Sequence, residues 1–225
     1  MDAISPVALK LGDLLQLAGV VLSPLLLAPL LLLFLPRGSA LALRVSRAVD
    51  ALSGALLDAA GWLGMAMAAV MLATVILRYV FGESFAWLKD SWIYAFAGCF
   101  MLASAGALKS AAHVRVDILF ARFSLRTRAV ADLAGAYVFL FPLMILILWA
   151  YAPQLANAWG AATGRLELSS EPEGLPLLYL FKTLVPVFAA TMILQGWSNS
   201  VKAACVIVGT STDAPALASN EEPHA

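Results

Sequence analysis

Charged side chains are scarce in this sequence. Only 12% of its 225 residues are Asp, Glu, Lys or Arg, about half the share found in an ordinary soluble domain. The 14 basic residues are balanced by 14 acidic ones, so the chain lacks the cationic surplus with which proteins bind nucleic acid phosphates. The composition therefore argues against a soluble enzyme, a nucleic-acid-binding protein and a disordered tail.

Residues that build metal, haem and disulfide sites are also rare. The chain has two cysteines, Cys99 and Cys205, and two histidines, His113 and His224. Both cysteines stand in apolar surroundings, where we expect small buried side chains. The sequence has no motif typical of a zinc site, a dinucleotide site or a P-loop. We therefore expect no cofactor, no metal and no catalytic residue in this chain.

Apolar residues, in contrast, make up 62% of the sequence and gather into five stretches without charge. These stretches are 14–36, 59–77, 91–108, 133–164 and 183–201, and the fourth is longer than one crossing needs. About 20 apolar residues in a helix cross the hydrocarbon core of a bilayer. Because backbone groups in lipid must be hydrogen-bonded internally, we expect helices. The predicted fold is an all-α integral membrane protein with a four-span core and one extra N-terminal span.

The chain is predicted to have three regions: 1–52 with the extra span and an amphipathic connector, the core 53–203, and a polar tail 204–225. The connector is expected to turn Leu41, Val45 and Leu52 to one face and Arg44, Arg47 and Asp50 to the other. This segment and 118–128 are predicted to form short helices lying in the membrane interface. The run 14–36 is longer than the apolar part of a signal peptide, so we expect it to be retained.

Lys and Arg set the expected orientation. They are more frequent in 37–58, 109–132 and the C-terminal tail than in the other connections, and such loops stay in the cytoplasm. With five spans, the N-terminus lies outside and the C-terminus inside. The 78–90 turn and the acidic 152–176 loop then face outward. The span centres carry no charge, whereas transporters line their paths with ionisable groups, so the chain is not expected to transport alone.

Two polar turns carry a family resemblance. Arg78-Tyr79-Val80-Phe81, Ser84-Phe85, Trp87 and an acidic residue are followed by a long apolar stretch and then by His113 and Val116-Asp117. This order resembles the small permease (Q subunit, DctQ type) of tripartite ATP-independent periplasmic (TRAP) transporters. Where the family usually has two Glu after the Trp, this chain has Lys89-Asp90. His113 and Asp117 could also form a proton pair, but we expect a helix cap or a subunit contact.

The second half of the chain supports the resemblance. Trp159, the run Glu171-Pro172-Glu173-Gly174-Leu175-Pro176, Lys182, Pro186 and Leu194-Gln195-Gly196 are similar to the mannitol/chloroaromatic or α-keto acid subgroup. The resemblance covers about residues 60–202, so the first 50 or so residues lie outside the usual four-span core.

The resemblance implies a non-catalytic subunit of a sodium-driven transporter for organic acids in the bacterial inner membrane. The expected partners are the lipid bilayer, a large permease that moves as an elevator and holds the substrate and sodium, and a periplasmic substrate-binding protein. The small subunit would enlarge the static scaffold and offer a docking surface. Residues expected at subunit interfaces or in structural contacts are Arg78, Trp87, Asp90, His113, Arg115, Asp117 and Lys182. Residues expected to dock the binding protein are Glu167, Glu171 and Glu173.

Two other functions stay open at this point. A membrane anchor of a redox complex would hold haem between histidines in its spans, and an absorbance scan would detect it. A self-sufficient small transporter would need polar residues inside the membrane. Lys182 is the charged candidate, but it stands near a span end, where its long side chain can reach the interface.

Overall fold

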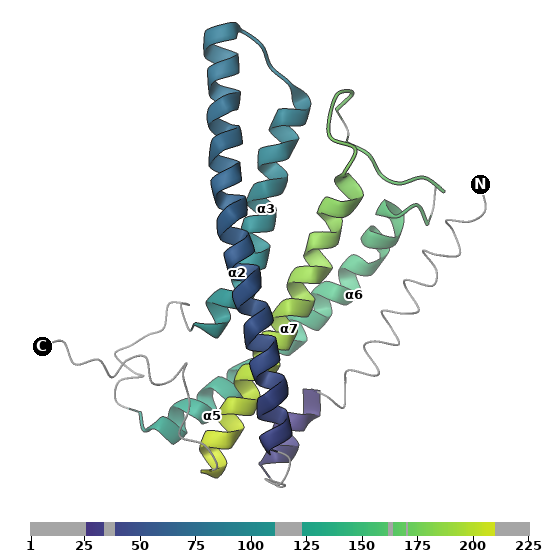
Figure 1. The fold of residues 1–225 in the computed structure, drawn as a ribbon. Helices are drawn as coiled ribbons and strands as arrows, with labels where there is room; N and C mark the ends of the chain where they lie inside the picture. The colour runs from purple at the N-terminus through teal and green to yellow at the C-terminus, as the bar shows by residue number, and fades with distance from the viewer. Residues whose placement is uncertain (1–25, 34–38, 111–122, 162–163, 170, 210–225) are drawn as a thin grey trace, which may run out of the picture.

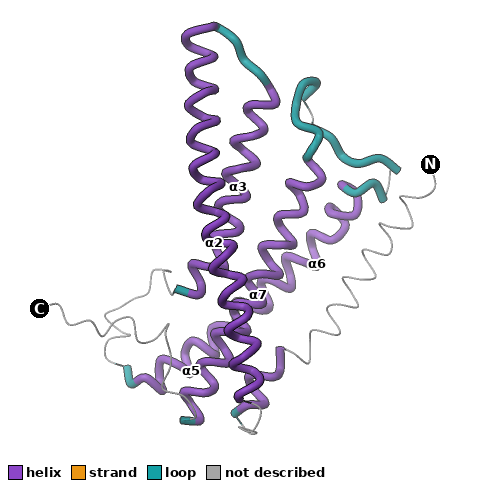
Figure 2. The backbone as a smooth tube through the Cα atoms, viewed as in Figure 1, coloured by secondary structure: helices purple, strands orange, loops and turns teal. Residues whose placement is uncertain are grey.

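The computed structural model describes residues 26–33, 39–110, 123–161, 164–169 and 171–209, and every regular element in these residues is helical (Figure 2). Helix α2 (Ser39–Ile76) continues into the π-helical turn η2 (Leu77–Phe81), and α3 (Ala86–Lys109) follows. Helix α5 (Leu125–Gly135) runs through η3 (Ala136–Leu140) into α6 (Phe141–Ala158), and α7 (Leu178–Val208) is the last element. The predicted all-α fold is confirmed.

Four helical segments are long and apolar enough to cross a membrane: Ser39–Phe81, Ala86–Lys109, Leu125–Ala158 and Leu178–Val208. They correspond to the four spans predicted for the core. Residues 26–32 form a short helical piece of the predicted extra span. The rest of that span lies outside the described residues, so the extra crossing stays a prediction.

Local signals explain where several helices begin and end. Gly82, at φ 74°, ends η2, and Gly209, at φ 78°, ends α7. Both adopt the left-handed conformation that glycine takes at a helix C-terminus without steric cost. Ser124 caps α5, because its hydroxyl accepts the backbone N–H of Thr127 at 3.2 Å. This bond satisfies one of the donors that the first turn of a helix leaves unpaired.

Helix α7 is the central element of the bundle. It packs against α2, α3, α5 and α6, while α2 and α3 form an antiparallel hairpin (Figure 1). At the end of the molecule that holds the N-terminus of α2, the helices cross around Phe141, Trp197, Val201 and Ala204. At the opposite end the two helix pairs spread apart, and the loop between α6 and α7 lies beside the start of α3 (Figure 1). We call these the crossing end and the open end.

Small residues allow the helices of the α2–α3 hairpin to approach closely. A Cβ added at Gly106 of α3 would lie 2.6 Å from the Cβ of Leu57 in α2, and one at Gly98 would lie 3.2 Å from Leu63. Glycine permits this contact because it has no side chain to separate the backbones.

The predicted separate interfacial helix over 41–52 is wrong. These residues form the first turns of α2, which continues without a break to Ile76. The buried face also differs from the expected one: Ser46, Val49 and Ser53 are buried, whereas Leu41 is 70% exposed, and Arg44 and Arg47 are exposed as expected. Ser46, Asp50 and Ser53 turn inward because they find hydrogen-bond partners on α7. Of the second predicted interfacial helix, 118–122 lies outside the described residues, and 125–128 begins α5.

Candidate functional site

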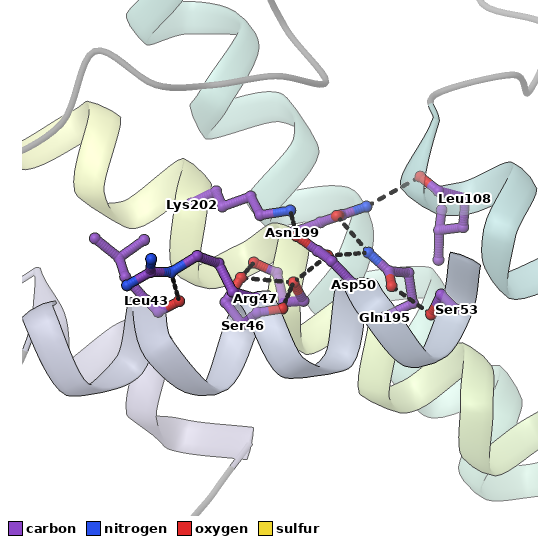
Figure 3. A network of polar contacts seen from close by, with 10 residues as sticks. Leu43, Ser46, Arg47, Asp50, Ser53, Leu108, Gln195, Asn199 and Lys202 are labelled. Atoms are coloured by element: carbon purple, nitrogen blue, oxygen red, sulfur yellow. Dashed lines mark hydrogen bonds and ion pairs between the residues drawn. The ribbon is translucent and has the colours of Figure 1, made fainter. Parts of the chain in front are cut away.

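A polar network joins α2 to α7 near the crossing end (Figure 3). At its centre the carboxylate of Asp50 lies 2.6 Å from the ammonium of Lys202, and the two side chains are only 17% and 12% exposed. Asp50 Oδ1 also accepts hydrogen bonds from Ser198 Oγ at 2.8 Å and from Gln195 Nε2 at 3.0 Å. A buried carboxylate of this kind is stable because a cation and neutral donors replace its water.

The network continues to a third helix. Ser53 Oγ donates to Gln195 Oε1 at 2.6 Å, and Gln195 Nε2 also contacts Asn199 Oδ1 at 3.0 Å. Asn199 Nδ2 then donates to the carbonyl of Leu108, at the end of α3, at 3.1 Å (Figure 3). Among the described residues, no buried side-chain nitrogen or oxygen lacks a hydrogen-bond partner. The arrangement therefore ties α2, α3 and α7 into one unit.

Sequence reasoning missed this network, although the spacing contained a signal. Ser46, Asp50 and Ser53 follow one another at i, i+4 and i+7, which places them on one helix face. Gln195, Asn199 and Lys202 repeat the same spacing in α7. Two polar faces of equal spacing indicate a contact between two membrane helices.

A second polar cluster lies at the open end and contains Asp90, one of the predicted site residues. Asp90 is 8% exposed. Its Oδ2 accepts a hydrogen bond from Ser169 Oγ at 2.8 Å and one from the backbone N–H of Leu175 at 3.0 Å. The structure therefore places Asp90 in a contact between α3 and the α6–α7 loop.

Lys182 and the three predicted docking glutamates lie at the same end. Lys182 Nζ lies 2.6 Å from both carboxylate oxygens of Glu167. Glu171 forms a looser pair with Lys89 at 3.6 Å, and both side chains are about half exposed. Glu173 is exposed. Glu167 is thus engaged within the chain, whereas Glu171 and Glu173 remain accessible.

The other predicted interface residues fall into two groups. Arg78 and Trp87 flank the α2–α3 turn at the open end, and both are exposed, Trp87 by 45%. The aromatic side chain of Tyr79 beside them is 81% exposed. His113, Arg115 and Asp117 lie outside the described residues, so their predicted role stays a prediction. The open end therefore holds Arg78, Trp87, Asp90, Lys182 and the glutamates, but in the described part of the chain their hydrogen bonds and ion pairs to other elements join only Asp90 to the α6–α7 loop, Lys182 to Glu167 and Lys89 to Glu171.

The described residues offer hydrogen bonding and ion pairing between helices. They contain no group of three His, Cys, Asp or Glu side chains that could hold a metal ion. In both networks a serine hydroxyl donates to a carboxylate of another element. These contacts hold separate elements of the chain together.

Comparison with known proteins identifies the family. No curated protein and no solved structure matches the chain significantly. The family model for the DctQ component of tripartite ATP-independent periplasmic transporters matches residues 67–206. The matched region is more than half of the chain and includes the outer part of α2, α3, the α5–α6 helix and nearly all of α7. The chain therefore belongs to the DctQ family, the small membrane component of TRAP transporters, as the sequence motifs predict.

Proposed function

We propose that the chain is the static scaffold subunit of a sodium-driven TRAP transporter for organic acids in the bacterial inner membrane. Family membership supports a transporter subunit. The observation that carries the scaffold role is the network around Asp50, which uses the buried polar side chains of α2 and α7 to fix one helix against the other. A helix that moved during transport would have to break these hydrogen bonds. Each buried polar group left without a partner would then destabilise the protein, because it has lost its hydration without gaining a hydrogen bond.

The large permease is the proposed membrane partner. The outer half of α2 packs mainly on α3, and Trp62, Met65 and Leu72 are each more than 60% exposed. Apolar side chains of this size can face lipid or another membrane helix. We propose that part of this α2–α3 surface contacts the permease, with Arg78 and Trp87 at its outer edge.

The periplasmic substrate-binding protein is the proposed partner of the open end. The distribution of Lys and Arg favours a position outside the cytoplasm for the α2–α3 turn and the α6–α7 loop. Glu171 and Glu173 would meet basic side chains there. Because exposed charges are screened by salt, raising the ionic strength should weaken this association.

A pull-down tests the partners. The chain, tagged at its C-terminus, is extracted from its native membrane in mild detergent, and co-purifying proteins are identified by mass spectrometry. The expected result is a much larger polytopic permease. Recovery of redox subunits, or of the chain alone, would contradict the proposal.

Reconstitution tests the scaffold role. Proteoliposomes are prepared with the permease alone or with the permease and this chain, and uptake is driven by a sodium gradient in the presence of the binding protein. We expect uptake only when both subunits and the gradient are present. Equal uptake by the permease alone would show that this chain is not a required scaffold.

A further inference from the structure

The α6–α7 loop contains a closed turn at the open end of the molecule. The backbone N–H of Gly174 donates to the carbonyl of Glu171 at 3.0 Å, which closes a four-residue turn with Pro172 and Glu173 at its centre. Proline favours the second position of such turns because its φ is already fixed. Pro172 and Glu173 are both exposed, so the turn presents a carboxylate outward.

Both ends of this turn are held by the Asp90 cluster. Ser169 Oγ accepts the backbone N–H of Glu171 at 3.3 Å and donates its own proton to Asp90 Oδ2. On the other side, Asp90 Oδ2 accepts the N–H of Leu175. One carboxylate oxygen of α3 therefore fixes the residues on both sides of the turn, and hydrogen bonds to a charged acceptor are stronger than neutral ones.

Gly174 shows how closely the turn fits. A Cβ added at Gly174 would lie 2.1 Å from Ser169 Oγ and 2.6 Å from Asp90 Oδ2. Any larger residue would push the turn away from the carboxylate. The turn can lie against Asp90 and Ser169 at this distance only because position 174 is a glycine.

We infer that Asp90 is a positioning residue that preorganises the Glu171–Gly174 turn for a basic patch on the periplasmic binding protein. This inference rests on the docking role proposed above. A turn that is already ordered loses less conformational entropy when it binds. Asp90 would act without touching the partner, while Glu173 would make the contact.

Hydrogen exchange tests the positioning step without any partner. The purified full-length chain in mild detergent is compared with Asp90→Ala, Asp90→Asn and Gly174→Ala by mass spectrometry of peptides covering 171–175. We expect about tenfold faster exchange in Asp90→Ala and Gly174→Ala, because the bond to a charged acceptor is lost or displaced. Asp90→Asn should keep near-native exchange, because its amide oxygen can accept the same two bonds.

The matched control is Gly61→Ala, because a Cβ at Gly61 meets nothing within 4 Å. Its exchange over 171–175 should equal that of the unchanged chain. Unchanged exchange in Asp90→Ala would overturn the inference at this step, whatever the function of the protein.

Uptake kinetics test the docking step. Proteoliposomes with the assembled transporter are titrated with the substrate-loaded binding protein recovered in the pull-down. We expect Asp90→Ala, Gly174→Ala and Glu173→Gln to raise the half-saturating concentration of the binding protein several-fold. The uptake rate at saturation should stay within about twofold of that of the unchanged protein. Asp90→Asn should behave as the unchanged protein in both respects. Loss of uptake at saturation without a change in half-saturation would assign Asp90 to assembly and overturn the inference. If the unchanged transporter needs no small subunit for uptake, the proposed function fails independently of the exchange result.

Discussion

The pair of Asp50 and Lys202 shows how a membrane helix can hold charge at low cost. Each charge faces the other at 2.6 Å, and neutral side chains from α7 satisfy the rest of the carboxylate. Breaking a buried pair by removing one partner is much more destabilising than removing both charges, because a single charge is left uncompensated. The effect of replacing either residue on the free energy of unfolding therefore depends on whether the other one keeps its charge.

A double-mutant comparison measures this dependence. Lys202→Met should lower the free energy of unfolding by about 3 kcal/mol. Asp50→Asn combined with Lys202→Met should restore most of it, since Asn still accepts hydrogen bonds from Ser198 and Gln195. The measurement is the thermal unfolding midpoint in mild detergent, with the exposed Arg44→Met as control. Losses that simply add would show that the two charges are not coupled.

Among the glycines of the α2–α3 hairpin, Gly106 leaves the least room for a side chain. Gly106→Ala would place a methyl group 2.6 Å from the Cβ of Leu57 and 3.1 Å from the carbonyl of Ser53. Because backbone as well as side chain must move, we expect a loss of about 1–3 kcal/mol in stability. Gly135→Ala, with open space at its Cβ, should be neutral or stabilising by up to about 1 kcal/mol. Equal unfolding midpoints for both variants would contradict this packing.

At the scale of elements, the first turns of α2 present a short polar face to α7, made of Ser46, Asp50 and Ser53, while Arg44 and Arg47 are exposed. The sequence predicts helix there, and the charge pattern of Arg44, Arg47 and Asp50 is amphipathic. In water such a helix would bury Leu41 and Leu52. Here those leucines are exposed, while Ser46 and Ser53 are buried, because polar partners for this face exist on α7 and apolar surroundings replace water outside the bundle.

A cross-link tests the α2–α7 contact. Ser46 Oγ and Ser198 Oγ are 2.7 Å apart, so cysteines at both positions should form a disulfide under mild oxidation. The experiment uses a background with Cys99→Ala and Cys205→Ala and detects the bond by mobility in non-reducing gels. Ser46→Cys with Ser200→Cys serves as control, since the Ser200 hydroxyl bonds within α7 to Gly196 and should not cross-link.

At the scale of the whole molecule, the cross-linked protein tests whether α2 and α7 move relative to each other during transport. A scaffold keeps its α2–α7 contact throughout transport, so the disulfide should leave sodium-driven uptake within about twofold of the reduced protein. Uptake that is lost on oxidation and recovers on reduction would show that α2 and α7 move during transport.

Orientation can be tested with single cysteines in the same background. Glu83→Cys and Glu173→Cys, both at the open end, should react with a membrane-impermeant maleimide in intact spheroplasts. Arg126→Cys, near the start of α5, should react only after permeabilisation, since loops rich in Lys and Arg stay inside. The reverse pattern would place the open end in the cytoplasm and remove the basis for docking a periplasmic protein there.

The sequence by itself determined the helical membrane fold, the four helices long and apolar enough to cross a membrane, and the family. These properties depend on local quantities: the length of apolar runs, the need to satisfy backbone hydrogen bonds in lipid, and motifs whose order can be read along the chain. The sequence also singled out Asp90 and Lys182 as polar residues at span boundaries, although it could not identify their partners.

Only the tertiary structure decided which polar residues meet. Asp50 and Lys202 are separated by 152 positions, and Asp90 and Leu175 by 85, so their contacts depend on how α2, α3 and α7 cross. The same packing turned Ser46, Asp50 and Ser53 of α2 toward α7 and brought Glu167 against Lys182. Pairings of this kind follow from the three-dimensional positions of whole helices, because a buried polar group takes whichever partner the packing brings within hydrogen-bonding distance.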